Sequence, residues 1–237
     1  YICYYLYVLR SRIKNYMWEG GCMNFKFREP VNSITHLIGA ILSVVGMFIL
    51  IMQSEYSDSN SVNKMLSAVI FGSSLIMLYS ASSIYHSLNV KERVISILKK
   101  LDHSMIFILI AGTYTPICLI TLNGVLGYVS LAIVWIMAIS GVLLKIFWIE
   151  CPRGLSTGIY IFMGWMCLIF IYPLWQAVKF QGILFLFLGG VMYTIGGVIY
   201  GLKKPNCFKA LGFHEIFHLF VMAGSLFHFL FMVNFVF

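Results

Sequence analysis

The stretch from Val125 to Trp148, VLGYVSLAIVWIMAISGVLLKIFW, decides the fold, because Lys145 is its only charged residue. A helix needs about 20 mostly apolar residues to cross the hydrocarbon core of a bilayer. Backbone amides at that depth have no water to bond with, so the segment is expected to be helical. The chain is therefore predicted to span a membrane.

The rest of the chain has the same character. Of its 237 residues, 61% are hydrophobic and 10% are charged, and the mean hydropathy is +0.92. A water-soluble domain could not cover its surface with so few polar groups. The predicted fold class is an all-α integral membrane protein, a bundle of seven transmembrane helices. The predicted spans are Ser33–Met52, Met65–Leu88, Asp102–Leu122, Val125–Trp148, Leu155–Val178, Gln181–Leu202 and Leu211–Phe237.

Lysine and arginine residues indicate the orientation. They gather before the first span and in the loops that follow the second and sixth spans, whereas the opposite loops carry only Lys64 and Lys179. Cytoplasmic loops carry the excess of these residues, so the amino terminus is predicted to be cytoplasmic and the carboxy terminus extracellular. This topology accounts for the net charge of +8, and no nucleic-acid partner is expected. Lys145 is expected to snorkel toward the interface.

The membrane domain is predicted to cover residues 26–237. Residues 1–25 read as a cytoplasmic segment of uncertain structure, with Met17 and Met23 as candidate start residues. The six cysteines have irregular spacing and no Cys-x-x-Cys pair, so they are expected to be free thiols that bind no metal.

A metal site is predicted where the polar residues of three spans meet. His214 and His218 are four residues apart and share one face at the start of the seventh span. His86 closes the second span and Asp102 opens the third, so the topology brings all four to the cytoplasmic end. Three imidazoles leave one tetrahedral position of Zn²⁺ open, which is typical of a catalytic site.

The neighbouring polar residues suggest roles. Asp102 would accept a proton from a zinc-bound water or hold that water by a hydrogen bond, and Ser82, one turn before His86, would orient the water or a substrate carbonyl. Glu29, Asn32 and His36 lie at the same depth and at helical spacing on the first span, where they form a supporting motif. His103 and His228 are assigned to packing within the bundle.

At these residues the chain resembles the hemolysin III family, the bacterial branch of the progestin and adiponectin receptor superfamily. The resemblance rests on Glu29-Pro-Val-Asn32-x-x-x-His36, on Ser82-x-x-x-His86 followed by Asp102, and on His214-x-x-x-His218. It implies a multi-pass protein of a bacterial plasma membrane with seven helices, and zinc held by the three histidines with Asp102 bonding a zinc-bound water. Adiponectin receptors are associated with hydrolysis of the ceramide amide, and the family name reflects lysis of red cells.

The leading functional prediction is a zinc-dependent, ceramidase-like hydrolase of a lipid amide or ester, with a membrane lipid as substrate or ligand. Three alternatives stay open. One is a pore-forming cytolysin, although no polar stripe crosses the whole bilayer. Another is a lipid-sensing receptor in which zinc is structural. The third is a zinc peptidase, because His214-Glu215-x-x-His218 matches the H-E-x-x-H pattern in which Glu215 would be the general base.

Overall fold

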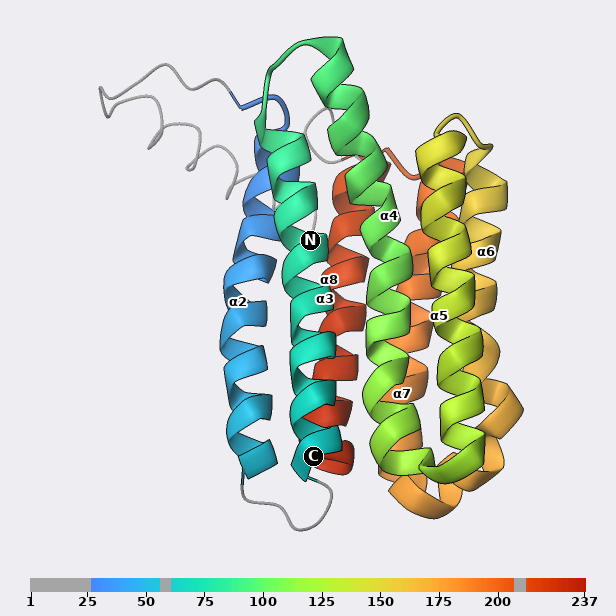
Figure 1. Ribbon diagram of the computed structural model, residues 1–237. Coiled ribbons are helices and arrows are strands. Elements are labelled where there is room, and N and C mark those ends of the chain that lie inside the picture. Colours follow the sequence, from blue (N-terminus) through green and yellow to red (C-terminus); the bar gives the residue numbers. More distant parts are fainter. Residues whose placement is uncertain (1–26, 56–60, 207–211) are drawn as a thin grey trace.

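The computed structural model describes residues 27–55, 61–206 and 212–237, and within these ranges every regular element is a helix (Figure 1). The predicted amino-terminal segment 1–25, with Met17 and Met23, lies outside them. The helices run alternately up and down, with the start of α2 and the end of α8 at opposite ends of the bundle. In chain order the elements are α2 Pro30–Glu55, α3 Ser61–Ser87, α4 Glu92–Pro116, η1 Ile117–Leu122, α5 Gly124–Phe147, α6 Arg153–Trp165, η2 Met166–Phe170, α7 Ile171–Leu202, α8 Phe213–Phe231 and η3 Met232–Val236.

Six helical segments of the described chain are long and apolar enough to cross a membrane, which confirms an integral membrane helical bundle. The fifth of them, Arg153–Leu202, has 50 residues. It is not one straight rod, because the 3₁₀ turn η2 interrupts it and Lys179 has non-helical angles, φ 57° and ψ −172°. The chain folds back here, and the Trp165 indole donates a hydrogen bond of 2.9 Å to the Thr194 hydroxyl. The break at Lys179 falls between the predicted spans Leu155–Val178 and Gln181–Leu202.

One predicted boundary of the third span changes, whereas Leu122 remains its last residue. Helix α4 begins at Glu92, so Asp102 lies well inside the helix and does not open it. Hydropathy measures apolar length, whereas a helix continues through charged residues as long as its backbone bonds are made. At the other end, Pro116 lacks an N–H and its ring crowds the carbonyl four residues earlier. The chain passes from α4 into the π-helix η1 directly after this proline.

Close helix contacts depend on small residues. A Cβ added at Gly141 of α5 would lie 2.3 Å from the ring of Phe107, which is fully buried on α4. A Cβ added at Gly189 of α7 would lie 2.2 Å from the ring of His228 on α8. These glycines let neighbouring backbones approach closely, as is common between helices in membranes.

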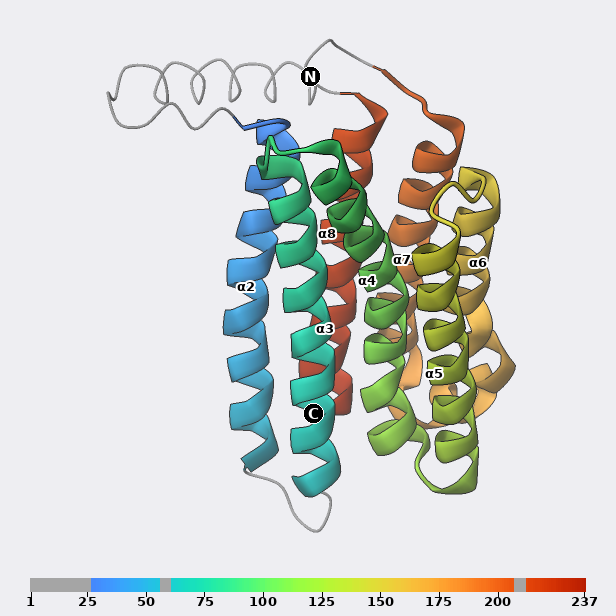
Figure 2. The ribbon, with the colours of Figure 1, turned by 45° about the horizontal axis from the view of Figure 1, so that its top comes forward.

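The outer face of the bundle is apolar. On α2, for example, the exposed fractions of Ile41, Leu42 and Phe48 are 58%, 60% and 61% in the isolated chain. Such a continuous apolar surface suits contact with lipid. Several buried polar residues, among them Asn32, His86 and His218, lie on the turns at one end of the bundle, where α2 and α8 begin and α3 ends; Figure 2 shows the position of these helix ends.

Candidate metal centre

Three histidines lie together at this end of the bundle. His86 is in the last turn of α3, and His214 and His218 are in the first two turns of α8. One ring nitrogen from each lies within 4.8 Å of the others, and the Nε2 atoms of His86 and His214 are 3.3 Å apart. Two imidazoles bound to one tetrahedral zinc ion, with Zn–N bonds near 2.0–2.1 Å, hold their nitrogens about 3.3 Å apart. The donor set of three imidazoles therefore fits a zinc ion, and the His86–His214 pair has the spacing of two zinc ligands.

The start of α8 sets the position of two of these rings. The Gly212 N–H donates a hydrogen bond of 2.9 Å to Oε2 of Glu215, a capping contact that begins the helix just before His214. Oε1 of Glu215 accepts a hydrogen bond of 3.2 Å from the Asn32 amide. Both carboxylate oxygens of Glu215 are therefore engaged in holding α8 and tying it to α2. This geometry gives the candidate peptidase base a structural role.

A carboxylate orients the His86 ring. Nδ1 of His86 donates a hydrogen bond of 2.7 Å to Oε2 of Glu29, which also accepts one of 3.0 Å from the Asn32 amide. The hydrogen bond from His86 lowers the pKa of Glu29 to about 2, so this side chain is a carboxylate at neutral pH. With its proton on Nδ1, the neutral ring turns the lone pair of Nε2 toward His214. Metal-binding histidines commonly have such a carboxylate partner.

The rings of His36 and His218 are stacked, with centroids 3.7 Å apart and planes at 14°. His36 is 3% exposed and His218 is 2% exposed. Neither nitrogen of His36, nor Nδ1 of His218, has a hydrogen-bond partner within the described residues. Buried imidazoles without partners are unfavourable, and a bound cation is one way to satisfy such a group. His36 therefore contacts the His218 ring from α2.

Ser82 and Asp102 stand beside the histidines. Ser82 is buried on α3 one turn before His86, and its hydroxyl lies next to the Asp102 carboxyl of α4. Both side chains line a cavity of about 630 Å³ that His36, His214 and His218 also line. The structure therefore brings every predicted site residue to one end of the bundle.

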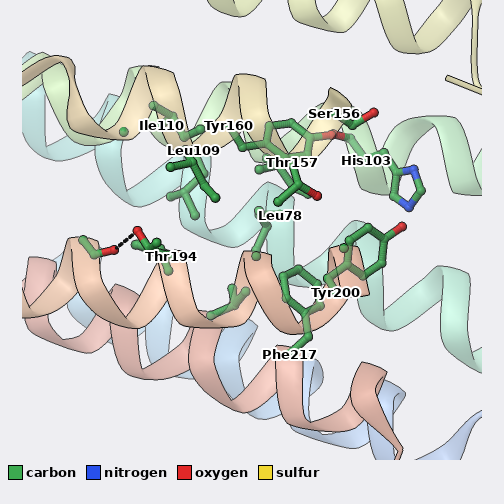
Figure 3. Close-up of a pocket in the computed structure, with 18 of the residues that line it drawn as sticks. Leu78, His103, Leu109, Ile110, Ser156, Thr157, Tyr160, Thr194, Tyr200 and Phe217 are labelled. Atoms are coloured by element: carbon green, nitrogen blue, oxygen red, sulfur yellow. Dashed lines mark hydrogen bonds between the residues drawn. The ribbon is translucent and has the colours of Figure 1, made fainter. Parts of the chain in front are cut away.

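The cavity continues from this polar end between α4, α6, α7 and α8 (Figure 3). Leu78, Leu109 and Ile110 line it, and Ile183 and Leu186 line its far part. A largely apolar chamber whose charged side chains and site histidines lie toward one end suits a molecule with a polar head and a hydrocarbon tail.

The prediction that Lys145 snorkels outward is wrong. Lys145 is 2% exposed, and its ammonium donates a hydrogen bond of 2.5 Å to the Ser156 hydroxyl of α6. The sequence did contain a pattern that indicates that Lys145 faces the interior of the bundle. Lys145 shares one helical stripe with Ala138 and Gly141, and all three are buried. Small residues on a stripe mark the face that packs on neighbouring helices.

Comparison with known proteins agrees with these features. Residues 25–229 match the family described as Haemolysin-III related. The chain is 40% identical over 204 residues to the Hemolysin-3 homolog of Bacillus subtilis, covering 85% of this chain and 91% of that protein. It is also 40% identical over 202 residues to Hemolysin-3 of Bacillus cereus, covering 85% and 88%.

A more distant relative is the ADIPOR-like receptor IZH2 of Saccharomyces cerevisiae, 27% identical over 227 residues, which cover 84% of this chain and 69% of that protein. This similarity extends the relationship from bacterial proteins to the adiponectin-receptor-like proteins. The chain therefore belongs to the Haemolysin-III related family of multi-pass membrane proteins, within the progestin and adiponectin receptor superfamily.

Proposed function

We propose that this protein is a zinc-dependent hydrolase that cleaves an amide or ester bond of a membrane lipid. The observation that carries the proposal is the convergence of His86, His214 and His218, within 4.8 Å of one another, beside a cavity with an apolar interior. Three imidazole ligands are typical of catalytic zinc, because the fourth position stays open. A structural zinc site would be closed by a fourth protein ligand.

The proposed setting is a bacterial plasma membrane crossed seven times, with the amino terminus and the site at the cytoplasmic side. The non-helical angles at Lys179 support two crossings within Arg153–Leu202. The opposite positions of the start of α2 and the end of α8 support an odd number of crossings (Figure 1). The excess of Lys and Arg in the loops at the histidine end supports the orientation.

Zinc bound by the three imidazoles would supply a water of lowered pKa and polarise a substrate carbonyl. The protein's own groups do the rest. The Asp102 carboxylate takes up a proton at its oxygen and later returns it to the leaving amine or alcohol. Ser82, whose hydroxyl lies beside Asp102, orients the water or the substrate carbonyl. Glu29 keeps the proton of His86 on Nδ1.

The cavity explains the choice of a lipid. Its apolar lining between α4 and α7 can hold acyl chains, while the polar end positions a carbonyl against the histidines. Desolvation of the carbonyl in this chamber strengthens the electrostatic effect of the site.

The test is lipid turnover by purified protein in nanodiscs, followed by mass spectrometry with and without a chelator. Asp102→Asn is expected to abolish turnover while zinc content stays unchanged, whereas His218→Ala is expected to lose both. Full activity of Asp102→Asn would overturn the role given to that residue. Turnover that survives complete removal of metal would overturn the hydrolase proposal as a whole.

Glu215→Gln separates the lipid hydrolase from a zinc peptidase. Under our proposal the variant keeps most of its lipid turnover, because no proton transfer depends on Glu215 and the amide oxygen can still accept one of its two hydrogen bonds. A peptidase that uses Glu215 as its base would lose about 10²-fold or more of its activity.

A further inference from the structure

The cavity has a second polar feature beside the histidines, formed around Lys145. The Lys145 ammonium offers three N–H donors, yet within the described residues it makes one hydrogen bond, to the Ser156 hydroxyl at 2.5 Å. The side chain is 2% exposed and lines the cavity. It forms no ion pair with any described carboxylate. A buried ammonium is stabilised by an anion that accepts its remaining donors.

The charges around Lys145 also favour a bound anion. Lys99, Arg153 and Lys203 also line the cavity, at the same end. Two acidic side chains line the cavity as well, Asp102 and Glu150; Glu150 is 82% exposed and its Oε1 lies 4.0 Å from the Lys99 ammonium. With four basic side chains against these two acids, the lining carries a net positive charge, which attracts an anion.

Neutral donors complete the group. The Thr157 hydroxyl is buried, at 6% exposure, and has no hydrogen-bond partner within the described residues. Figure 3 shows Ser156, Thr157, His103 and Tyr200 gathered at one end of the cavity, away from Ile110. Ser156 and Thr157 lie in the first turns of α6, where the helix dipole is positive.

This group lies one aromatic ring away from the metal centre. The Tyr200 ring is 5.2 Å from the Arg153 guanidinium carbon and 6.3 Å from the His103 ring. The same ring is 5.8 Å from the ring of His214. A single ligand can therefore reach the basic group and the histidines together.

We infer that the basic group of Lys145, Arg153, Ser156 and Thr157 binds the phosphate of an anionic lipid, whose carbonyl then lies at the histidines and whose acyl chains fill the apolar part of the cavity. A phosphate is favoured over a carboxylate because it offers three strong acceptor oxygens to donors that come from several sides. The inference rests on the proposed function for the choice of bond, and it adds the class of substrate: a phosphate-bearing lipid.

The test uses the full chain in detergent micelles that contain equal amounts of dioleoyl phosphatidic acid and dioleoyl phosphatidylcholine. These lipids share their acyl chains and differ in the choline group, so lipid retained on the protein reports the headgroup. Native mass spectrometry is expected to show a preference of about tenfold for phosphatidic acid, which corresponds to one charge-assisted contact. Lys145→Met and Arg153→Gln should each remove most of this preference.

Lys100→Met is the matched control. Lys100 is the neighbour of Lys99 in sequence and bonds the Ile146 carbonyl at an exposed site, outside the cavity. It should keep the full preference. Arg153→Gln also covers the case in which Lys145→Met does not fold, because Arg153 lies at the first position of α6 and the substitution removes no buried charge from the core. Equal binding of the two lipids by the wild type, or a preference kept in both cavity variants, would overturn the inference.

Two further measurements distinguish a lipid phosphate from free phosphate, and this inference from the proposed function. If inorganic phosphate stabilises the protein through Lys145 while the lipids bind equally, the site is one for free phosphate and the lipid assignment is wrong. Wild-type protein treated with a chelator should keep its preference for phosphatidic acid, which tests binding without turnover. Selective binding without any turnover would defeat the proposed function alone, and turnover of neutral lipids without selectivity would defeat this inference alone.

Discussion

The contact between Glu29 and His86 makes the sharpest prediction for the metal centre. Nδ1 of His86 lies 2.7 Å from the carboxylate, which is the geometry of a charge-assisted hydrogen bond. Such a bond is worth about 1.5–3 kcal/mol, and the Glu29 side chain is 40% exposed, so solvent screening places it at the lower end. A loss of about 1.5 kcal/mol corresponds to roughly tenfold weaker zinc binding for Glu29→Ala.

Glu29→Gln should fall between the wild type and Glu29→Ala. Its amide oxygen can still accept the Nδ1 proton, which keeps the ring orientation, but the negative charge that raises the basicity of the ligand is lost. Zinc affinity is measured by competition with a chromophoric chelator at fixed pH and ionic strength. Glu92→Ala, at the exposed start of α4, is the matched control for loss of an acidic side chain at the same end. Affinity of Glu29→Ala equal to that of the control would refute the reasoning.

Three other predictions concern the bundle and its activity. Gly141→Ala should lower the free energy of unfolding by about 1–3 kcal/mol, because its Cβ would lie 2.3 Å from the buried Phe107 ring. The measurement is unfolding in detergent. The control Gly158→Ala, where a Cβ meets nothing within 4 Å, should be as stable as the wild type or slightly more stable. Tyr79→Phe removes a hydrogen bond of 2.6 Å to the Ser225 hydroxyl and should cost about 1 kcal/mol in the same unfolding assay. Protein stripped of metal and inserted in liposomes should release no trapped dye, since the ionisable groups gather at one end of the bundle; steady release would support a pore instead.

The sequence carried most of the information about this site. Because hydrophobic spans must cross the bilayer in alternate directions, the order of spans alone places His86, His214 and Asp102 in one layer. The four-residue spacing of His214 and His218 adds a shared helix face. The same reasoning places Glu29, Asn32 and His36 of the first span at the depth of the histidines. What could not be predicted was the pairing: that Glu29 contacts His86, and that His36 stacks on His218.

Side-chain direction was the part that the sequence left open or indicated wrongly. Lys145 was expected at the interface and lies inside against Ser156, and Glu215 matched a catalytic pattern and instead caps α8. A long side chain on a membrane helix has two polar environments within reach, water at the bilayer surface and polar groups in the bundle. The choice between them depends on the helix next to it.

By itself, then, the sequence determined that this chain is a bundle of apolar helices with a cluster of histidines and acidic residues at one end, because the thickness and dryness of the bilayer restrict what any such segment can do. Only the tertiary structure decided which of those residues touch, and that a cavity of about 630 Å³ joins the histidines to a buried lysine. Contacts between helices depend on packing at close range, through residues such as Gly141 and Gly189, and no local pattern encodes the partner that fills the space opposite.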